Sequence, residues 1–172
     1  LGRAKTRRNG HAGRGSLLIM AAAKSSATMK TVDPDDLASA LAEWVDDLSV
    51  TLPAPKSSFR ITCAAQTRVY SDRGHFEEMM VNLLSNAWRH SQKKTSSVSI
   101  TANVDPEKQR AVISVIDDGP GVPTEISDRI FEPFYSGSGS TGLGLYLVRE
   151  LALANGGSVV LCNTFTFPET AV

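Results

Sequence analysis

The sequence predicts an α+β fold in which an antiparallel or mixed sheet carries helices on one face. Strand-like and helical segments occur in groups, and one pair of strands is joined by a short turn. The 172 residues suffice for one domain with a core, and their composition, 41% hydrophobic and 21% charged, is typical of a soluble globular protein. We predict a flexible basic segment, or a remnant of a linker or dimerisation region, at residues 1–30, and one folded domain at residues 31–172.

Three helices are predicted from capping signals and apolar spacing. The first begins at Asp33-Pro34, with Asp33 as the N-cap, and continues to about Leu48. The second follows the capping pair Ser71-Asp72 and covers residues 74 to about 91. The third runs from about residue 143 to 154 and stops at Asn155-Gly-Gly157.

Strands are predicted between these helices. Residues 59–62 and 68–70 resemble short strands on either side of a turn, and residues 158–161 resemble a final strand. Residues 98–102 alternate in polarity, and the turn at 105–108 joins them to an apolar run at 111–116, so these two strands form a hairpin. Within the basic first thirty residues, the apolar stretch from Ser16 to Ala23 is predicted as a short helix.

Composition excludes several classes of function. Eighteen basic and eighteen acidic residues give a net charge of zero, so no overall field favours nucleic acid or anionic lipid. Two distant cysteines, Cys63 and Cys162, support neither a zinc site nor a disulfide framework. The apolar run at 17–23 is far shorter than the roughly 20 residues of a membrane span. We expect a cytoplasmic domain, in a full-length protein that other segments can anchor to a membrane.

The second helix carries a polar stripe opposite its apolar face. Asn82 and Asn86 are one helical turn apart, Glu78 lies a turn earlier, and Arg89 and His90 continue the stripe. An amide oxygen on such a stripe suits magnesium bound to phosphate. For an arbitrary helix, however, an exposed solvated face is the commoner explanation.

Two glycine-rich segments complete the candidate site. Asp117-Asp118-Gly119-Pro120-Gly121 follows a strand, where a carboxylate can accept a hydrogen bond from the exocyclic amine of adenine. Thr141-Gly142-Leu143-Gly144-Leu145 follows a Gly/Ser run at residues 136–140 and opens a helix, whose N-terminus favours phosphate. This second segment is neither a Walker A loop nor a Rossmann loop. Taken singly, the first is also typical of a plain turn and the second of a flexible connector.

In this order the three segments resemble the N, G1 and G2 boxes of the histidine kinase catalytic domain, within the wider family of gyrase, Hsp90 and MutL ATPases. Residues 130–135 (Ile-Phe-Glu-Pro-Phe-Tyr) resemble its F box, and the resemblance covers roughly residues 32 to 161. It implies a two-layer α/β sandwich of the Bergerat type, with a mixed, mostly antiparallel sheet and helices on one face. It also implies ATP and Mg²⁺ as cofactors, bound by residues 31–172.

The resemblance also implies residue roles. Asn86 binds magnesium and Asn82 lies near the phosphates; these two are the candidate catalytic residues. Phe131 and Phe134 either anchor the lid, the Gly/Ser run at residues 136–140, or pack in the core. The same resemblance implies that Arg89 contacts phosphate, that His90 packs near adenine, and that Asp117 accepts a hydrogen bond from the adenine amine. It implies that Gly119 and Gly121 form the floor of the pocket. The loop that binds the phosphates would consist of Thr141, Gly142, Leu143, Gly144 and Leu145.

The activity implied is a protein-histidine kinase that transfers the γ-phosphoryl group of ATP to a histidine. Hydrolytic relatives carry a Glu where this chain has Asn82, which cannot accept a proton. The usual acceptor motif is absent from the sequence, so we expect the acceptor on a separate dimerisation module, with a response regulator as a further partner. The full-length protein is expected to be a homodimer and the isolated domain a monomer. Alternatives are a catalytically degenerate ATP-binding sensor, a hydrolytic ATPase, and a serine kinase of the anti-sigma type.

Overall fold

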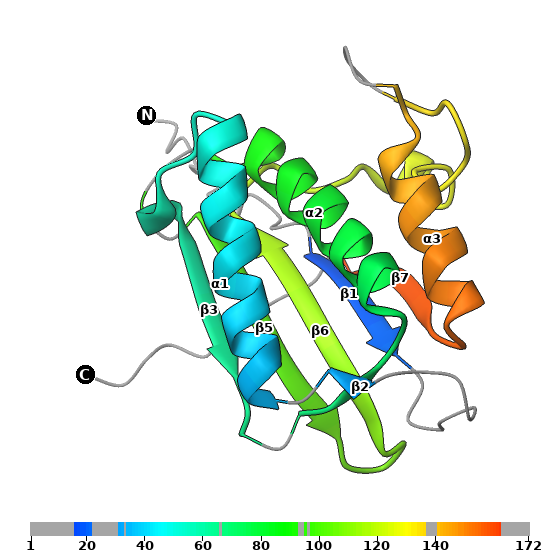
Figure 1. Ribbon diagram of the computed structural model, residues 1–172. Coiled ribbons are helices and arrows are strands. Elements are labelled where there is room, and N and C mark those ends of the chain that lie inside the picture. Colours follow the sequence, from blue (N-terminus) through cyan, green and yellow to red (C-terminus); the bar gives the residue numbers. More distant parts are fainter. Residues whose placement is uncertain are drawn as a thin grey trace, which may run out of the picture.

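A five-stranded sheet forms one layer of the molecule (Figure 1). The computed structural model describes residues 16–21, 31–32, 34–65, 67–92, 95, 97–136 and 141–162. The strands of the sheet, in spatial order, are β3 (Phe59–Cys63), β5 (Val98–Asp105), β6 (Arg110–Asp117), β1 (Ser16–Ala21) and β7 (Ser158–Cys162). The short strands β2 (Thr31–Val32) and β4 (Val69–Tyr70) form a separate two-stranded sheet.

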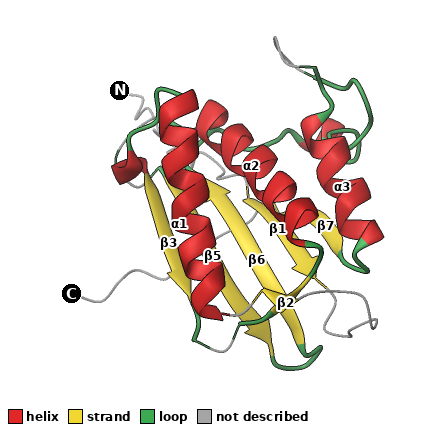
Figure 2. Cartoon of the chain, in the orientation of Figure 1, coloured by secondary structure: helices red, strands yellow, loops and turns green. Residues whose placement is uncertain are grey.

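Three helices form the second layer, all on the same face of the sheet (Figure 2). They are α1 (Pro34–Thr51), α2 (Arg73–His90) and α3 (Gly144–Ala154), with short 3₁₀ turns at Lys56–Ser58 and Thr124–Ile126. α2 begins as predicted, because the Asp72 side chain accepts a hydrogen bond from the His75 backbone N–H at 3.0 Å. Asp33, the predicted cap of α1, lies outside the described residues.

The strand pairings confirm a mixed, mostly antiparallel sheet. β5 and β6 form the predicted hairpin, from Val98 opposite Asp117 to Asp105 opposite Arg110. β3 pairs with β5 in parallel, whereas β4 leaves this sheet and pairs with β2. The two short strands β3 and β4, which were predicted on either side of a turn, therefore belong to different sheets.

The predicted helix at Ser16–Ala23 is wrong. Ser16–Ala21 is the strand β1, which lies between β6 and β7 and pairs antiparallel with both. A short apolar run without strict alternation is compatible with a buried strand as well as with a buried helix. Here the strand forms because the segment pairs with β6 and β7, which lie about a hundred or more residues away in sequence. The predicted division of the chain at residue 31 stays a prediction.

The core lies between the sheet and the helices. It is built from the inner faces of α1 and α2 and from the helix-facing residues of the central strands, such as Ile100 and Ile113. Trp44 of α1 meets Phe76 of α2 edge to face, with ring centroids 5.6 Å apart. Within the part of the chain that is described, no helix is long and apolar enough to cross a membrane.

Candidate functional site

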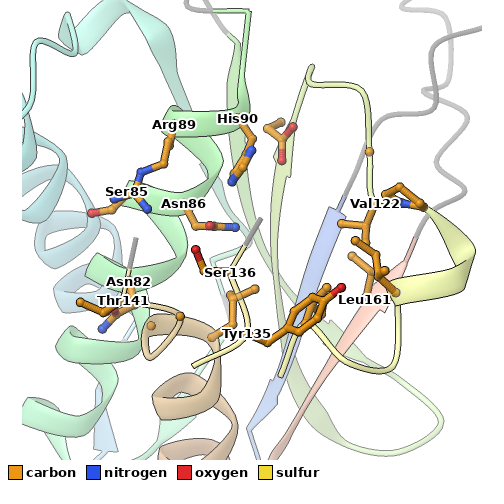
Figure 3. Close-up of a pocket in the computed structure, with 18 residues that line it drawn as sticks. Asn82, Ser85, Asn86, Arg89, His90, Val122, Tyr135, Ser136, Thr141 and Leu161 are labelled. Atoms are coloured by element: carbon orange, nitrogen blue, oxygen red, sulfur yellow. The ribbon is translucent and has the colours of Figure 1, made fainter. Parts of the chain in front are cut away.

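A cavity of about 550 Å³ lies where α2, the start of α3 and the segment after β6 meet. In Figure 3 the labelled residues of α2 line one side, and Val122, Tyr135 and Leu161 lie across from them. The residues that line it are Asn82, Ser85, Asn86, Arg89, His90, Asp117, Gly121, Val122, Pro123, Ile126, Ile130, Tyr135, Ser136, Thr141, Gly142, Gly144, Leu145 and Leu161. Three segments that are distant in sequence therefore enclose one space.

The polar stripe of α2 faces this cavity. Asn82, Asn86 and Arg89 follow one another at helical spacing and all line it, while the residues on the inner side of the helix are buried in the core. The Asn82 amide nitrogen donates a hydrogen bond to the Glu78 carbonyl at 2.8 Å. That bond fixes the amide orientation, so the Asn82 oxygen faces the N-terminus of α3.

Asp117 is the single carboxylate among the lining residues and ends strand β6. Its Oδ1 accepts a hydrogen bond from the Gly119 backbone N–H at 2.8 Å, which fixes the carboxylate and leaves Oδ2 for a ligand. Burial raises the pKa of this carboxyl, and the Gly119 hydrogen bond and nearby His90 only partly oppose the rise. A partly desolvated acceptor of this kind suits a neutral donor such as an amine.

Gly119 is buried and does not line the cavity. A Cβ atom at this position would lie 2.3 Å from the His90 carbonyl oxygen and 2.6 Å from Asp117 Oδ1. The absence of a side chain therefore lets the segment after β6 approach the end of α2. Asp118 also connects these two segments, because its Oδ1 accepts a hydrogen bond from the Gln92 backbone N–H at 2.8 Å.

The two ends of the predicted lid are held together. The Phe134 N–H donates to the Gly142 carbonyl at 3.0 Å, and both residues have positive φ, 63° and 68° respectively. A Cβ atom on Gly142 would come within 2.5 Å of the Phe134 backbone. Phe131 packs in the core, whereas the Phe134 side chain is 75% exposed. Residues 137–140 between these ends lie outside the described residues.

The G2-like segment leads into α3 as predicted. No side-chain hydrogen bond caps the N-terminus of this helix, and its first residues, Gly144 and Leu145, line the cavity. Gly144 lies against Asn82: a Cβ atom there would be 2.9 Å from the Asn82 Oδ1. The backbone N–H groups of an uncapped helix N-terminus are donors suited to an anion.

Most of the residues predicted from sequence for the nucleotide site line this cavity, and their roles stay predictions. All the predicted nucleotide contacts line the cavity except Gly119 and Leu143. Ser85 was missed although it lies three residues after Asn82 and shares its stripe. The apolar side was also missed (Val122, Pro123, Ile126, Ile130 and Leu161), and so were Tyr135 and Ser136.

The side chains at the cavity suit a metal ion that is bound mainly by the phosphates of a nucleotide. Among the described residues, no cluster of three or more His, Cys, Asp or Glu side chains could hold a metal ion. Asn86 instead offers one hard carboxamide oxygen at the cavity surface. Mg²⁺ is commonly bound by one or two protein oxygens together with phosphate oxygens and water, so these residues fit magnesium bound to a nucleotide.

Comparison with known families gives one match over more than half of the chain. The model of the "Histidine kinase-, DNA gyrase B-, and HSP90-like ATPase" family matches residues 71–170. Among curated relatives, the sensor protein kinase PilS of Pseudomonas aeruginosa is 42% identical over 93 residues, and the sensor protein RstB of Escherichia coli 38% over 120 residues. These alignments cover 52% and 64% of this chain, and 17% and 26% of the relatives.

Solved structures agree on the fold. The mycobacterial sensor histidine kinase MprB is similar at a TM-score of 0.61 and 21% identity, over 78% of this chain and 95% of that one. Full-length ShkA in complex with AMPPNP is similar at a TM-score of 0.60 and 25% identity, over 81% of this chain and 31% of that one. The chain spans no more than about a quarter of the length of the curated relatives named above.

Proposed function

Because the chain belongs to the histidine kinase-, DNA gyrase B- and HSP90-like ATPase family, we propose that its cavity binds ATP with Mg²⁺ for phosphoryl transfer to a protein histidine. The single observation that carries this proposal is the convergence of Asn86, Asp117 and Gly144 on one cavity. Of the curated relatives, PilS is named a sensor protein kinase, which supports this activity over the others in the family.

Adenine is proposed to bind at the end of β6. Oδ2 of Asp117 accepts the hydrogen bond of the exocyclic amine, while the backbone N–H of Gly119 holds Oδ1. Val122, Ile126 and Leu161 supply apolar surface for the ring. Guanine carries a carbonyl where adenine carries this amine, so the carboxylate repels it and the site selects adenine.

The phosphates are proposed to lie between α2 and the start of α3. Arg89 contributes a positive charge, and the first N–H groups of α3 donate hydrogen bonds. Asn86 would hold magnesium, which supplies charge neutralisation for the phosphates when bound. The Asn82 side chain is held by its hydrogen bond to the Glu78 carbonyl, and its oxygen lies against Gly144.

The proposed reaction requires no general base from this domain. A neutral histidine of the acceptor attacks the γ-phosphorus through its imidazole nitrogen, the bond to the β–γ bridging oxygen breaks, and ADP leaves. Asn82 cannot accept a proton, and that favours transfer over hydrolysis by an activated water. We further propose that the acceptor lies on a dimerisation module of a homodimeric full-length kinase that serves a response regulator.

Binding of labelled ATP to the chain with Mg²⁺ tests the site. We expect Asn86→Ala to lose the magnesium dependence of ATP affinity, and the matched variant Ser49→Ala, on α1 outside the cavity, to retain it. Equal ATP affinity in Asn86→Ala and the parent chain, with and without Mg²⁺, contradicts the assignment of Asn86.

Transfer of label from [γ-³²P]ATP to a fragment that carries an acceptor histidine tests the activity. Acid-labile label on the fragment supports the kinase. Binding of ATP without transfer favours a degenerate nucleotide sensor, and steady release of inorganic phosphate without the fragment favours a hydrolytic ATPase.

A further inference from the structure

Asn155 connects the end of α3 to the beginning of α2. It is the residue after the last turn of α3, and it is 4% exposed. Its side chain contacts three groups: the Oδ1 atom accepts from the Asp72 backbone N–H at 2.9 Å, and the Nδ2 atom lies 2.7 Å from the Leu151 carbonyl and 3.1 Å from His75 Nδ1. Asp72 is the N-cap of α2, and His75 lies in its first turn.

These partners fix the orientation of the amide. The Leu151 carbonyl accepts only, and the Asp72 N–H donates only, so exchanging the oxygen and nitrogen of Asn155 would oppose like groups at both. Nδ2 then donates to His75 Nδ1, and the proton of the His75 ring lies on Nε2. Three of the four hydrogen-bonding positions of this buried amide are therefore occupied, and two of the three partners lie at the start of α2.

The backbone of this helix end is equally well defined. The Gly157 N–H donates to the Ala152 carbonyl at 2.8 Å and the Gly156 N–H to the Leu153 carbonyl at 3.0 Å, with φ of 70° at Gly156. This is the Schellman arrangement, in which a left-handed glycine ends the helix. Asn155 is therefore bonded to the last turn of α3, and its side chain connects this end of the helix to the start of α2.

The position of α3 along α2 follows from this contact. The two helices run antiparallel: Asn155 meets Asp72, and Gly144 meets Asn82. At 1.5 Å per residue, both separations are about 15–17 Å, so the two contacts agree in register. A shift of α3 along α2 would move its N-terminal N–H groups relative to Asn82 and Asn86.

We propose that Asn155 is a positioning residue that sets the register of α3 on α2, and thereby holds the N-terminus of α3 at the distance required for nucleotide phosphates. This inference rests on the proposed nucleotide site. Hydrogen-bonding groups at such a site must be held within roughly 0.5 Å to be effective. Adenine contacts at Asp117 belong to β6 and do not depend on this register.

The test compares ATP with adenosine, both measured by titration on the 172-residue chain. We expect Asn155→Ala to weaken ATP binding by about tenfold and to change adenosine affinity by less than about twofold. His75→Ala, which removes one of the three partners, gives a smaller loss for ATP alone. Thr67→Ala is the matched control, because Thr67 is also buried, donates one hydrogen bond to the Ala102 carbonyl at 3.2 Å and does not line the cavity.

The outcomes separate this inference from the proposed function. Equal losses for ATP and adenosine in Asn155→Ala, or no loss for either, overturn the positioning role. The same loss for ATP in Thr67→Ala also overturns it, because general loosening of the fold then explains both. Asp117→Asn is the control for the site: if it weakens neither ligand, the nucleotide site itself is wrong, whatever Asn155→Ala does.

Discussion

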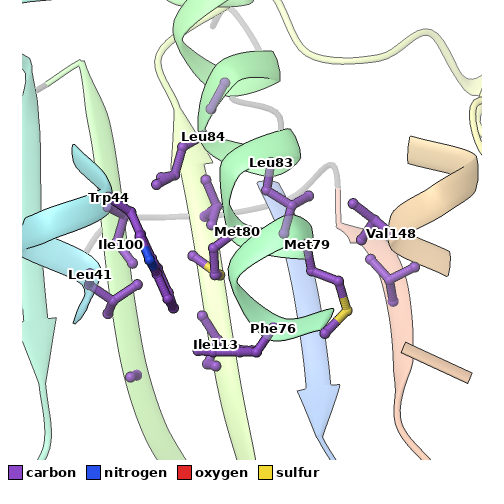
Figure 4. Packing of buried hydrophobic residues seen from close by; sticks show 14 of the residues in the cluster. Leu41, Trp44, Phe76, Met79, Met80, Leu83, Leu84, Ile100, Ile113 and Val148 are labelled. Atoms are coloured by element: carbon purple, nitrogen blue, oxygen red, sulfur yellow. The ribbon is translucent and has the colours of Figure 1, made fainter. Parts of the chain in front are cut away.

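The two sides of α2 differ sharply in composition and contacts. The inner side is apolar and almost fully buried against the sheet and α1, as Figure 4 shows for Phe76, Met79, Met80, Leu83 and Leu84. The other side presents Asn82, Asn86 and Arg89 to the cavity. One helix thus carries the centre of the core and one side of the ligand site.

This difference separates stability from binding within eighteen residues. Burial of the inner side provides the free energy that holds α2 in place. The cavity side contributes little to folding, because Asn is a poor helix former and its amides face an open space. Substitutions on the two sides should therefore change different measurements.

The largest effect is expected from Phe76→Ala on the inner side. The Phe76 side chain is fully buried and packs against Trp44, so its loss leaves a cavity and should reduce the free energy of unfolding by about 3–5 kcal/mol. Urea unfolding followed by circular dichroism measures this. Val50→Ala, at a position 86% exposed, is the control and should leave unfolding unchanged. A loss of less than about 1 kcal/mol in Phe76→Ala contradicts the assigned core.

Gly119→Ala should change both stability and ATP binding, because Gly119 lies where the end of α2 meets the adenine site. The new methyl group would collide with the His90 carbonyl oxygen and with Asp117 Oδ1. We expect the free energy of unfolding to fall by about 1–3 kcal/mol, with a loss of ATP affinity in the protein that remains folded. A variant that unfolds like the parent chain and binds ATP equally well would contradict the close approach at Gly119.

Asp117→Asn should change ATP binding without lowering stability. We expect ATP affinity to fall by about tenfold, or ~1.4 kcal/mol, while the free energy of unfolding at pH 7 stays equal or rises. The reason is that burial raises the pKa of Asp117, so its ionised form lowers stability at neutral pH.

The pH dependence of this difference has a definite sign. The parent chain gains stability from Asp117 as the pH falls through the raised pKa, and the Asn variant does not. Any advantage of Asp117→Asn in unfolding should therefore shrink as the pH is lowered from 7 to 4. An advantage that grows over this range contradicts the desolvated carboxylate.

The smallest effect is expected from Asn82→Ala. It removes the bond to the Glu78 carbonyl and opens space beside Gly144, so ATP affinity should fall by about two- to fivefold with almost no change in unfolding. A large loss of stability would show that the cavity side of α2 supports the fold after all. Steady phosphate release that disappears in this variant would revive a hydrolytic role.

The parts of the fold that sequence predicts are those set by local signals. α2 follows from its cap at Asp72 and its apolar spacing, and the β5–β6 hairpin from alternation and a turn. β1 could not be predicted, because its apolar run contains no period that distinguishes strand from helix. Its state depends on two partner strands, β6 and β7, that are distant in sequence. β3 and β4 likewise lie in different sheets because β3 pairs with β5 and β4 pairs with β2.

The candidate site shows the same limit. Asn86, Asp117 and Gly144 were predicted because each lies in a short motif with its own pattern. Leu161 and Ile130 were missed, because an apolar residue that lines a cavity looks the same in sequence as one in the core. The contacts of Asn155 with α2 could not be predicted either, because its sequence pattern indicates only the end of a helix.

The place of β1 in the sheet has a consequence for how the protein is made. Ser16 pairs with Ile116 on one side and with Cys162 on the other, so β7 is attached to the sheet only through β1 among the described strands. Because β1 precedes both of its neighbours in the chain, it cannot pair with them until β6 and then β7 have been synthesised. Closure of the sheet therefore depends on pairings of long sequence separation, which form more slowly than local contacts.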